Sequence, residues 1–148
     1  MTKPYLDFTF LIRLVLRTQG TRLASRTLSS FKPPFLLNDL LVLQVENFLE
    51  QATIREPEST ALVRHGRAFW EREFSELVFQ SQSVDWSAAC HEAIRLNRGA
   101  NAWPGTPLAL LHLAAALQVE ATHLLSFDIR QRALARKSGL VVLPEVLS

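Results

Sequence analysis

Short apolar segments alternate along this chain with longer stretches in which apolar residues recur every three or four positions. Each segment of the first kind predicts a strand, at residues 3–7, 35–37, 122–128 and 140–145. Each stretch of the second kind predicts a helix, at residues 8–20, 21–30, 40–52, 58–80, 84–96, 107–118 and 129–139. Short apolar strands separated by helices are typical of a parallel sheet that is covered by helices. The pattern therefore predicts an α/β fold.

Several polar residues and prolines mark where the predicted helices begin and end. Asn38 or Asp39 can cap the helix at 40–52 by accepting a hydrogen bond from a backbone N–H, and Asp85 can cap the helix at 84–96. Pro107 suits the first turn of its helix, and Gly139 closes the last one. Two glycines and two prolines within residues 97–107 predict a loop.

Length and composition predict one ordinary globular domain over residues 1–148. Hydrophobic residues make up 48% of the chain and charged residues 20%, a balance that excludes an intrinsically disordered protein. We expect a cytoplasmic protein, because the single cysteine permits no internal disulfide and no apolar stretch approaches the ~20 residues that span a bilayer. The net charge of +2 permits a polyanionic partner without requiring one.

Three acidic residues enter apolar surroundings from distant parts of the sequence. Asp7 and Asp128 each follow a predicted strand, and parallel strands end at the same edge of a sheet, where ligands bind. Glu46 lies on the inward-looking side of the helix at 40–52. Buried carboxylates need cations or a metal, and oxygen ligands without His or Cys favour Mg²⁺ or Mn²⁺. The alternative is that each acid caps a helix or forms half of a surface ion pair.

Basic residues cluster on several of the predicted helices. Arg13 and Arg17 share one face of the first helix, and Arg130 follows Asp128 closely. If the acids hold a metal, arginines such as Arg13 and Arg130 would guide a phosphate backbone towards it. The alternative is a set of solvated helix faces. No glycine-rich nucleotide-binding motif and no nucleophile elbow occurs in the chain, which excludes those two classes of site.

Three segments of the chain resemble the PIN domain, as found in the VapC toxins of bacterial toxin–antitoxin pairs. They are PYLDFTFLIRL, LLVLQVENFLE and ALLHLAAALQVEATHLLSFDIRQRALARKSGLVV, which occur in the family's order, whereas residues 53–105 match only in helical character. The resemblance implies a three-layer α/β/α fold with a parallel sheet of four to five short strands. It also implies a Mg²⁺- or Mn²⁺-dependent ribonuclease, in which a metal-activated water attacks a phosphodiester.

The resemblance also implies roles for individual residues. It assigns the first, second and fourth metal-binding acids to Asp7, Glu46 and Asp128, and two hydroxyl residues that orient ligands or substrate to Thr9 and Ser126. The third acid is expected three residues before His112, where the chain has Ala109. Thr106 stands where relatives commonly carry Arg. Mg²⁺ accepts water ligands, so three acids can still hold one ion weakly.

Two functions follow from these assignments. The first is a metal-dependent RNA endonuclease of the VapC type, weakened by the loss of one acid. The alternative is a catalytically inactive PIN-like module that binds an antitoxin or RNA. The resemblance further implies a small VapB-like antitoxin, whose C-terminal segment blocks the acidic site, and a homodimer.

Overall fold

Three parallel strands form the main sheet, and Asp7 and Asp128 follow two of them. The strands β1 (Pro4–Leu6), β4 (His123–Leu125) and β5 (Val141–Leu143) pair in the order β1-β4-β5. A second parallel pair consists of β2 (Phe35–Leu37) and β3 (Phe79–Ser81), and β2 lies beside β1. These strands come from a computed structural model, which describes residues 1–55, 60–99 and 106–147. The coarse prediction of an α/β fold with parallel strands is confirmed.

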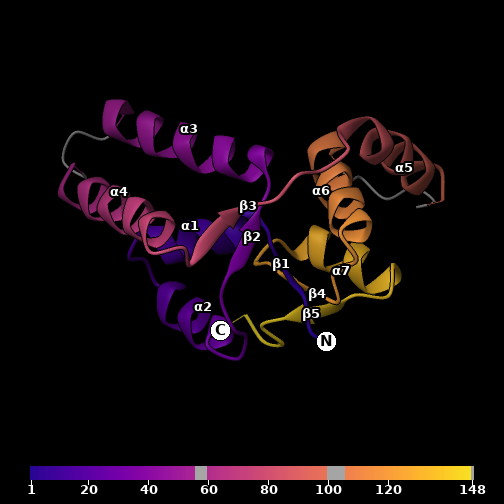
Figure 1. The fold of residues 1–148 in the computed structure, drawn as a ribbon, viewed down its shortest axis with the longest axis horizontal. Helices are drawn as coiled ribbons and strands as arrows, with labels where there is room; N and C mark the ends of the chain where they lie inside the picture. The colour runs from indigo at the N-terminus through magenta and orange to yellow at the C-terminus, as the bar shows by residue number, and fades with distance from the viewer. Residues whose placement is uncertain (56–59, 100–105, 148) are drawn as a thin grey trace.

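Helices connect the strands and fall into two groups. The described residues form seven of them: α1 (Phe8–Val15), α2 (Thr21–Leu28), α3 (Asp39–Arg55), α4 (Thr60–Ser75), α5 (Trp86–Gly99), α6 (Pro107–Gln118) and α7 (Ile129–Lys137). Figure 1 shows α1 to α4 on one side of the strands and α5 to α7 on the other. In the part of the chain that the structure describes, no helix is both long and apolar enough to cross a membrane.

Polar side chains cap the helices that follow strands, as the sequence predicts. Asn38, and not Asp39, caps α3, because its Oδ1 accepts the N–H of Leu41 at 3.0 Å. Asp85 caps α5 by accepting the N–H of Ala88, also at 3.0 Å. Each cap satisfies a backbone donor that the helix itself leaves unpaired.

The predicted helix at 58–80 is wrong at its C-terminal end. The structure ends α4 at Ser75 and places β3 at Phe79–Ser81. Leu77 has a φ of 60°, a left-handed conformation that interrupts a helix, and the buried ring of Phe79 then packs against Trp70. Hydrophobic spacing does not separate a short apolar strand from one more helical turn. Most of the predicted loop at 97–107 lies outside the described residues.

Candidate functional site

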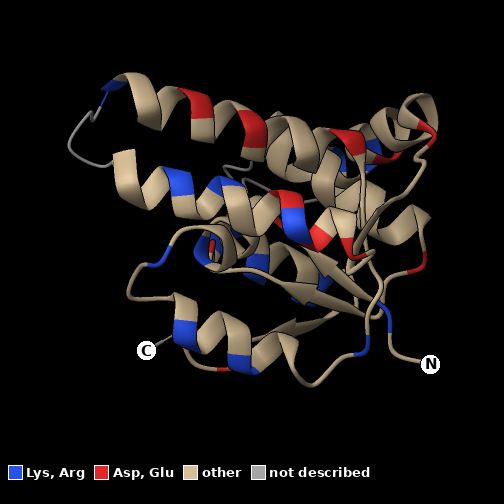
Figure 2. Cartoon of the chain, turned by 60° about the vertical axis from the view of Figure 1, so that its left-hand side comes forward, with Lys and Arg blue, Asp and Glu red and all other residues tan. Residues whose placement is uncertain are grey.

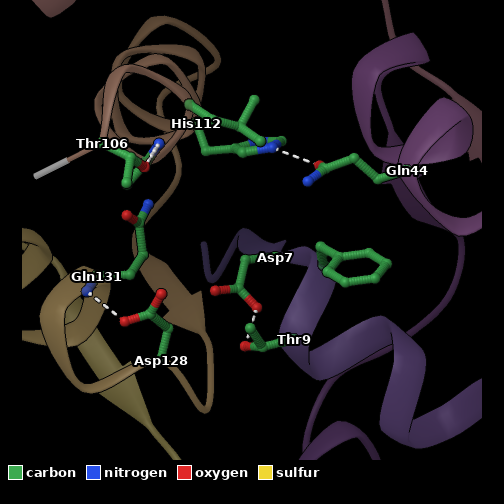
Figure 3. A pocket seen from close by; sticks show the side chains of 10 residues that line it. Asp7, Thr9, Gln44, Thr106, His112, Asp128 and Gln131 are labelled. Carbon is green, nitrogen blue, oxygen red and sulfur yellow. Dashed lines mark hydrogen bonds between the residues drawn. The ribbon is translucent and has the colours of Figure 1, made fainter. Parts of the chain in front are cut away.

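A small cleft with both polar and apolar lining residues opens where three helices begin. It has a volume of about 140 Å³, and its lining comes from the first turns of α1, α6 and α7 and from α3. Figure 3 shows the side chains that surround it. The lining residues are Asp7, Phe8, Thr9, Gln44, Thr106, Leu108, Ala109, His112, Asp128 and Gln131.

Asp7 is the most enclosed acid of the cleft. It follows β1 and caps α1, so that its Oδ1 accepts the N–H of Phe10 at 2.9 Å and the hydroxyl of Thr9 at 2.7 Å. Its Oδ2 accepts a hydrogen bond from the hydroxyl of Ser126. Both carboxylate oxygens are therefore held by donors that the fold positions.

Burial has the largest effect on the chemistry of Asp7. The side chain is 5% exposed, and burial raises the pKa of the carboxyl group from 3.8 to about 6. The hydrogen bonds from Ser126, Thr9 and Phe10 lower the pKa, while the negative charge of Asp128 raises it further. Burial outweighs the hydrogen bonds, so Asp7 takes up a proton at a higher pH than an exposed aspartate does.

The sheet register brings Thr9, Ser126 and Asp128 to Asp7. Leu6 pairs with Leu125, and the N–H of Asp7 donates to the carbonyl of Leu125, so the residues that follow β1 and β4 meet at one edge. The hydroxyl of Ser126 accepts the N–H of Asp128 at 3.0 Å while it donates to Asp7. Asp128 in turn caps α7. These four predicted site residues are brought together by the fold.

Arg132 binds the backbone of the two segments that follow β4 and β5. Its side chain is 3% exposed, and its guanidinium donates to the carbonyl of Ser126 at 2.8 Å and to that of Pro144 at 2.6 Å. The buried cation thereby ties the segment after β4 to the segment after β5. This contact holds the Ser126 backbone at the cleft together with the hydrogen bond from the Ser126 N–H to the carbonyl of Leu143.

Glu46, the predicted second acid, does not join Asp7 and Asp128. It lies on the opposite flank of α3, where its carboxylate accepts the indole N–H of Trp70 at 3.0 Å and pairs with Arg67 at 3.1 Å. Gln44 lines the cleft instead. Residues two apart on a helix are about 200° apart around its axis, which puts Gln44 and Glu46 on either side of the buried stripe that contains Val45. The interpretation of Glu46 as an inward-facing acid is corrected accordingly.

A chain of hydrogen bonds holds Gln44 in the cleft wall. The amide of Asn38 donates to the phenol oxygen of Tyr5 at 2.8 Å, and that hydroxyl bonds Nδ1 of His112 at 2.8 Å. Nε2 of His112 bonds Oε1 of Gln44 at 2.6 Å. When the His112 ring is neutral, the Tyr5 hydroxyl donates to Nδ1 and the Nε2–H group donates to Gln44, so the chain runs from Asn38 to Gln44. Burial lowers the pKa of His112 to about 4, which keeps the ring neutral.

The cleft wall on α6 carries no acid. Ala109 lines the cleft at the position where the resemblance expects a carboxylate. Thr106 caps α6, since its hydroxyl oxygen accepts the N–H of Ala109 at 3.1 Å. The two residues therefore shape the entrance of the cleft without adding charge.

The two arginines predicted to hold RNA lie outside the cleft lining. The guanidinium of Arg13 donates to the carbonyl of Thr9 at 2.8 Å and stacks 4.2 Å from the ring centre of Phe127. Arg130 is exposed on the first turn of α7, beside Asp128. Packing occupies Arg13, whereas the side chain of Arg130 extends at the surface near the cleft.

The donors of the cleft fit a catalytic Mg²⁺ or Mn²⁺ poorly. Asp7 and Asp128 are the two carboxylates that line it, while Gln44 and Ala109 add no charge. Among residues 1–55, 60–99 and 106–147, no three His, Cys, Asp or Glu side chains lie close enough together to hold an ion.

A second polar depression, the basic groove, lies at the other end of α1. It runs between α1, α2 and α4, and its charged lining residues are Arg17 and Arg72, with His65 beside them. α4 packs closely against α1 at Gly66, which has no side chain. A Cβ at this position would lie 2.9 Å from the carbonyl oxygen of Val15. Figure 2 shows basic residues on α2 and along α4. Residues 8–38, which include α1 and α2, contain five basic residues and no acid: Arg13, Arg17, Arg22, Arg26 and Lys32.

Nothing in the sequence indicates that Gln44 and Gln131 line a cleft or that a basic groove forms. Arg17 shares a predicted helix face with Arg13, but nothing in the sequence places α4 next to it. Comparison with known proteins adds no assignment: no protein-family model matches the chain, and no curated protein does either. The function is therefore argued from the cleft and the basic groove themselves.

Proposed function

We propose that the chain is a PIN-like α/β domain that binds single-stranded RNA without hydrolysing it. The observation that carries the binding is the basic groove, where Arg17, His65 and Arg72 line one depression. Arg72 has a long contact of 3.8 Å with Glu73, and its side chain is 57% exposed. Such a groove attracts a phosphate backbone and releases its counterions.

The groove also offers an aromatic side chain to a nucleic acid. Phe69 lines it, and the guanidinium of Arg72 stands 5.6 Å from the centre of the Phe69 ring. Cations that follow the backbone, combined with rings on which bases stack, are the usual means of binding single strands without sequence preference. This combination favours single-stranded RNA over a compact anion.

The proposal that the protein does not hydrolyse RNA rests on the small number of carboxylates in the cleft. The resemblance assigns the second acid to Glu46 and expects the third at the position of Ala109, but Gln44 lines the cleft in place of Glu46, and Ala109 has no carboxylate. Without these two acids, the negative charge of the cleft comes from Asp7 and Asp128. We therefore propose that the cleft has lost the metal-dependent chemistry of the family it resembles.

RNA binding is tested by fluorescence anisotropy with a labelled single-stranded RNA, titrated at several salt concentrations. We expect Arg17→Gln with Arg72→Gln to weaken binding about tenfold. The slope of log affinity against log salt should fall by about 1.4, because each lost phosphate contact contributes roughly 0.7 on a single strand. The matched control removes two exposed charges from the other helix group, Arg98→Gln with Arg136→Gln. Equal losses for the two double variants would show that net charge, and not the groove, binds the RNA.

A metal-dependent ribonuclease is the second candidate, and one observation favours it. Asp7 and Asp128 lie in one cleft with Thr9 and Ser126 bonded to the Asp7 carboxylate, as the resemblance predicts for that part of the site. Two carboxylates can hold one Mg²⁺ that also binds a substrate phosphate. The VapB-like antitoxin, the homodimer and the cytoplasmic location remain predictions from the sequence.

A further inference from the structure

Gln131 has an unusual place in the cleft wall. Its side chain is 3% exposed, and neither its Nε2 nor its Oε1 has a hydrogen-bond partner within the described residues. A buried amide that makes no hydrogen bond destabilises the folded state, since it has lost its contacts with water. An unpaired group of this kind in a cleft wall points to a ligand that completes its hydrogen bonds.

The neighbours of Gln131 narrow the chemistry of that ligand. In Figure 3, the amide of Gln131 and the carboxylate of Asp128 lie on one side of the cleft, with Gln44 across from them. One oxygen of Asp128 accepts the N–H groups of Arg130 and Gln131. Its other oxygen accepts no hydrogen bond from residues 1–55, 60–99 or 106–147, so it remains for a donor from the ligand. Phe8 adds a half-buried aromatic ring to the lining.

We propose that the cleft binds an unpaired nucleobase that carries an exocyclic amino group, with the Gln131 amide as its hydrogen-bonding partner. The proposal rests on the RNA binding proposed above and assigns the cleft a role in it. A carboxamide bonds an amino group and the adjacent ring nitrogen of a base at the same time, as Gln does with adenine. The ring of Phe8 supplies a surface on which the base stacks.

The acids of the cleft explain the preference for an amino group. Asp128 accepts from an amino group, as carboxylates do with the amino group of cytosine. Uracil has carbonyl oxygens on both sides of its ring N–H and would place one of them against a carboxylate. Adenine and cytosine therefore fit the cleft, and uracil does not.

The same acids keep phosphate groups out of the cleft. Asp7 and Asp128 repel them, while the basic groove attracts them at the other end of α1, about 12 Å along the helix axis. A strand whose backbone follows the basic residues can thus direct one base into the cleft. The two sites divide the recognition of base and backbone between them.

The first test uses nucleosides, which carry no phosphate. Adenosine, cytidine and uridine are titrated into ¹⁵N-labelled protein, and the side-chain amide signals of Gln131 and Gln44 are followed by NMR. We expect saturable shifts of these signals with adenosine and cytidine, and none with uridine at the same concentrations. Equal responses to all three nucleosides, or no response to any, would overturn the proposal.

The second test compares labelled oligoadenylate with oligouridylate on the wild-type protein and on Gln131→Met. We expect the wild-type protein to prefer oligoadenylate about tenfold, the order of discrimination from one bidentate base contact. Gln131→Met should abolish the preference and leave the affinity for oligouridylate unchanged. It should also unfold at the same or a higher temperature, because it removes two unpaired buried polar atoms. Gln51→Met, about two helical turns beyond Gln44 on α3, is the control and should keep the preference.

The outcomes separate the base site from RNA binding in general. If nucleosides shift the Gln131 signal but no oligonucleotide binds, the base site stands and the proposed RNA-binding function falls. If both oligonucleotides bind equally and Gln131→Met changes nothing, RNA binding stands and the base site falls. A large loss of thermal stability in Gln131→Met would show that Gln131 has a structural partner, which also contradicts the proposal.

Discussion

The two ends of α1 differ in how their polar groups are held. At the N-terminal end, in the cleft, Asp7 accepts hydrogen bonds from a backbone N–H and from two hydroxyl groups, and it is nearly fully buried. At the C-terminal end, in the basic groove, Arg17 and Arg72 are exposed. The cleft holds its groups by hydrogen bonds, whereas the groove presents charge on exposed side chains.

This difference suits the cleft to discrimination between ligands and the groove to attraction of a phosphate backbone. Fixed donors and acceptors discriminate between ligands by geometry, because a mismatch leaves a buried group unpaired. Exposed arginines attract any phosphate backbone and are weakened by salt. Perturbing the cleft should therefore change stability and specificity, while perturbing the groove should change affinity and salt dependence.

The largest effect is expected from Arg132→Met, which removes the support of the cleft. The substitution leaves the carbonyls of Ser126 and Pro144 without their buried donor. We expect the free energy of unfolding to fall by about 3 kcal/mol, measured by urea denaturation, because each buried carbonyl left unpaired costs about 1–3 kcal/mol.

Arg130→Met is the matched control, since it removes an exposed arginine from the same helix. It should change stability by no more than about 0.5 kcal/mol, the usual range for a surface substitution. Similar losses in the two variants would mean that the cleft edge does not depend on the buried guanidinium.

An intermediate effect, with a defined pH dependence, is expected from Asp7→Asn. The folded-state pKa of about 6 exceeds the ordinary value of 3.8, so the folded protein binds this proton more tightly than the unfolded chain. The stabilisation from the protonated carboxyl is present below about pH 4 and is lost as the pH rises through 6. Asparagine keeps the cap without the buried charge, so the variant should be more stable than the wild type by about 2 kcal/mol at pH 8.

The two proteins should have similar stability near pH 4, and urea denaturation at a series of pH values measures the difference. His112, whose pKa is lowered to about 4, acts in the opposite direction, because its neutral folded form loses stability as the pH falls below 6.5. It is present in both proteins, so it cancels in the difference between them. A difference that does not change with pH would contradict the account of Asp7.

The smallest effect is expected from Glu46→Gln. The amide oxygen still accepts the indole N–H of Trp70, and the lost ion pair with Arg67 is partly exposed. Stability should fall by less than about 1 kcal/mol, and RNA affinity in the anisotropy assay should not change. A strong loss of RNA binding or of metal binding in this variant would show that Glu46 belongs to the functional site.

The sequence predicts the edge of the sheet better than the helix faces around it. Strand ends and caps are local features, which is why Asp7 and Asp128 were expected to meet and do. The choice between Gln44 and Glu46 depends on which flank of α3 faces α6, and that is set by packing between distant segments. Periodicity gives the buried stripe of a helix but does not say which neighbour lies on each side.

The sequence does not predict that the amide of Gln131 is buried without a hydrogen-bond partner in the described residues. Its position in the first turns of α7 reads as an ordinary surface site, and its burial results from the cleft walls around it. The basic groove was also hidden, because it forms where α4 packs onto α1 and α2. Contacts between segments far apart in the chain decide both features.

One assay measures both RNA binding and the absence of RNA cleavage. A labelled single-stranded RNA is incubated with the protein in millimolar Mn²⁺ or in EDTA, and binding and chain length are followed together. The double variant Gln44→Glu with Ala109→Asp, which adds two acids to the cleft, is assayed alongside. We predict that the wild-type protein binds RNA with or without metal and leaves it intact, while the double variant gains metal-dependent cleavage. Mn²⁺-dependent cleavage by the wild-type protein as fast as by the double variant, or no binding of the RNA at all, would contradict the account.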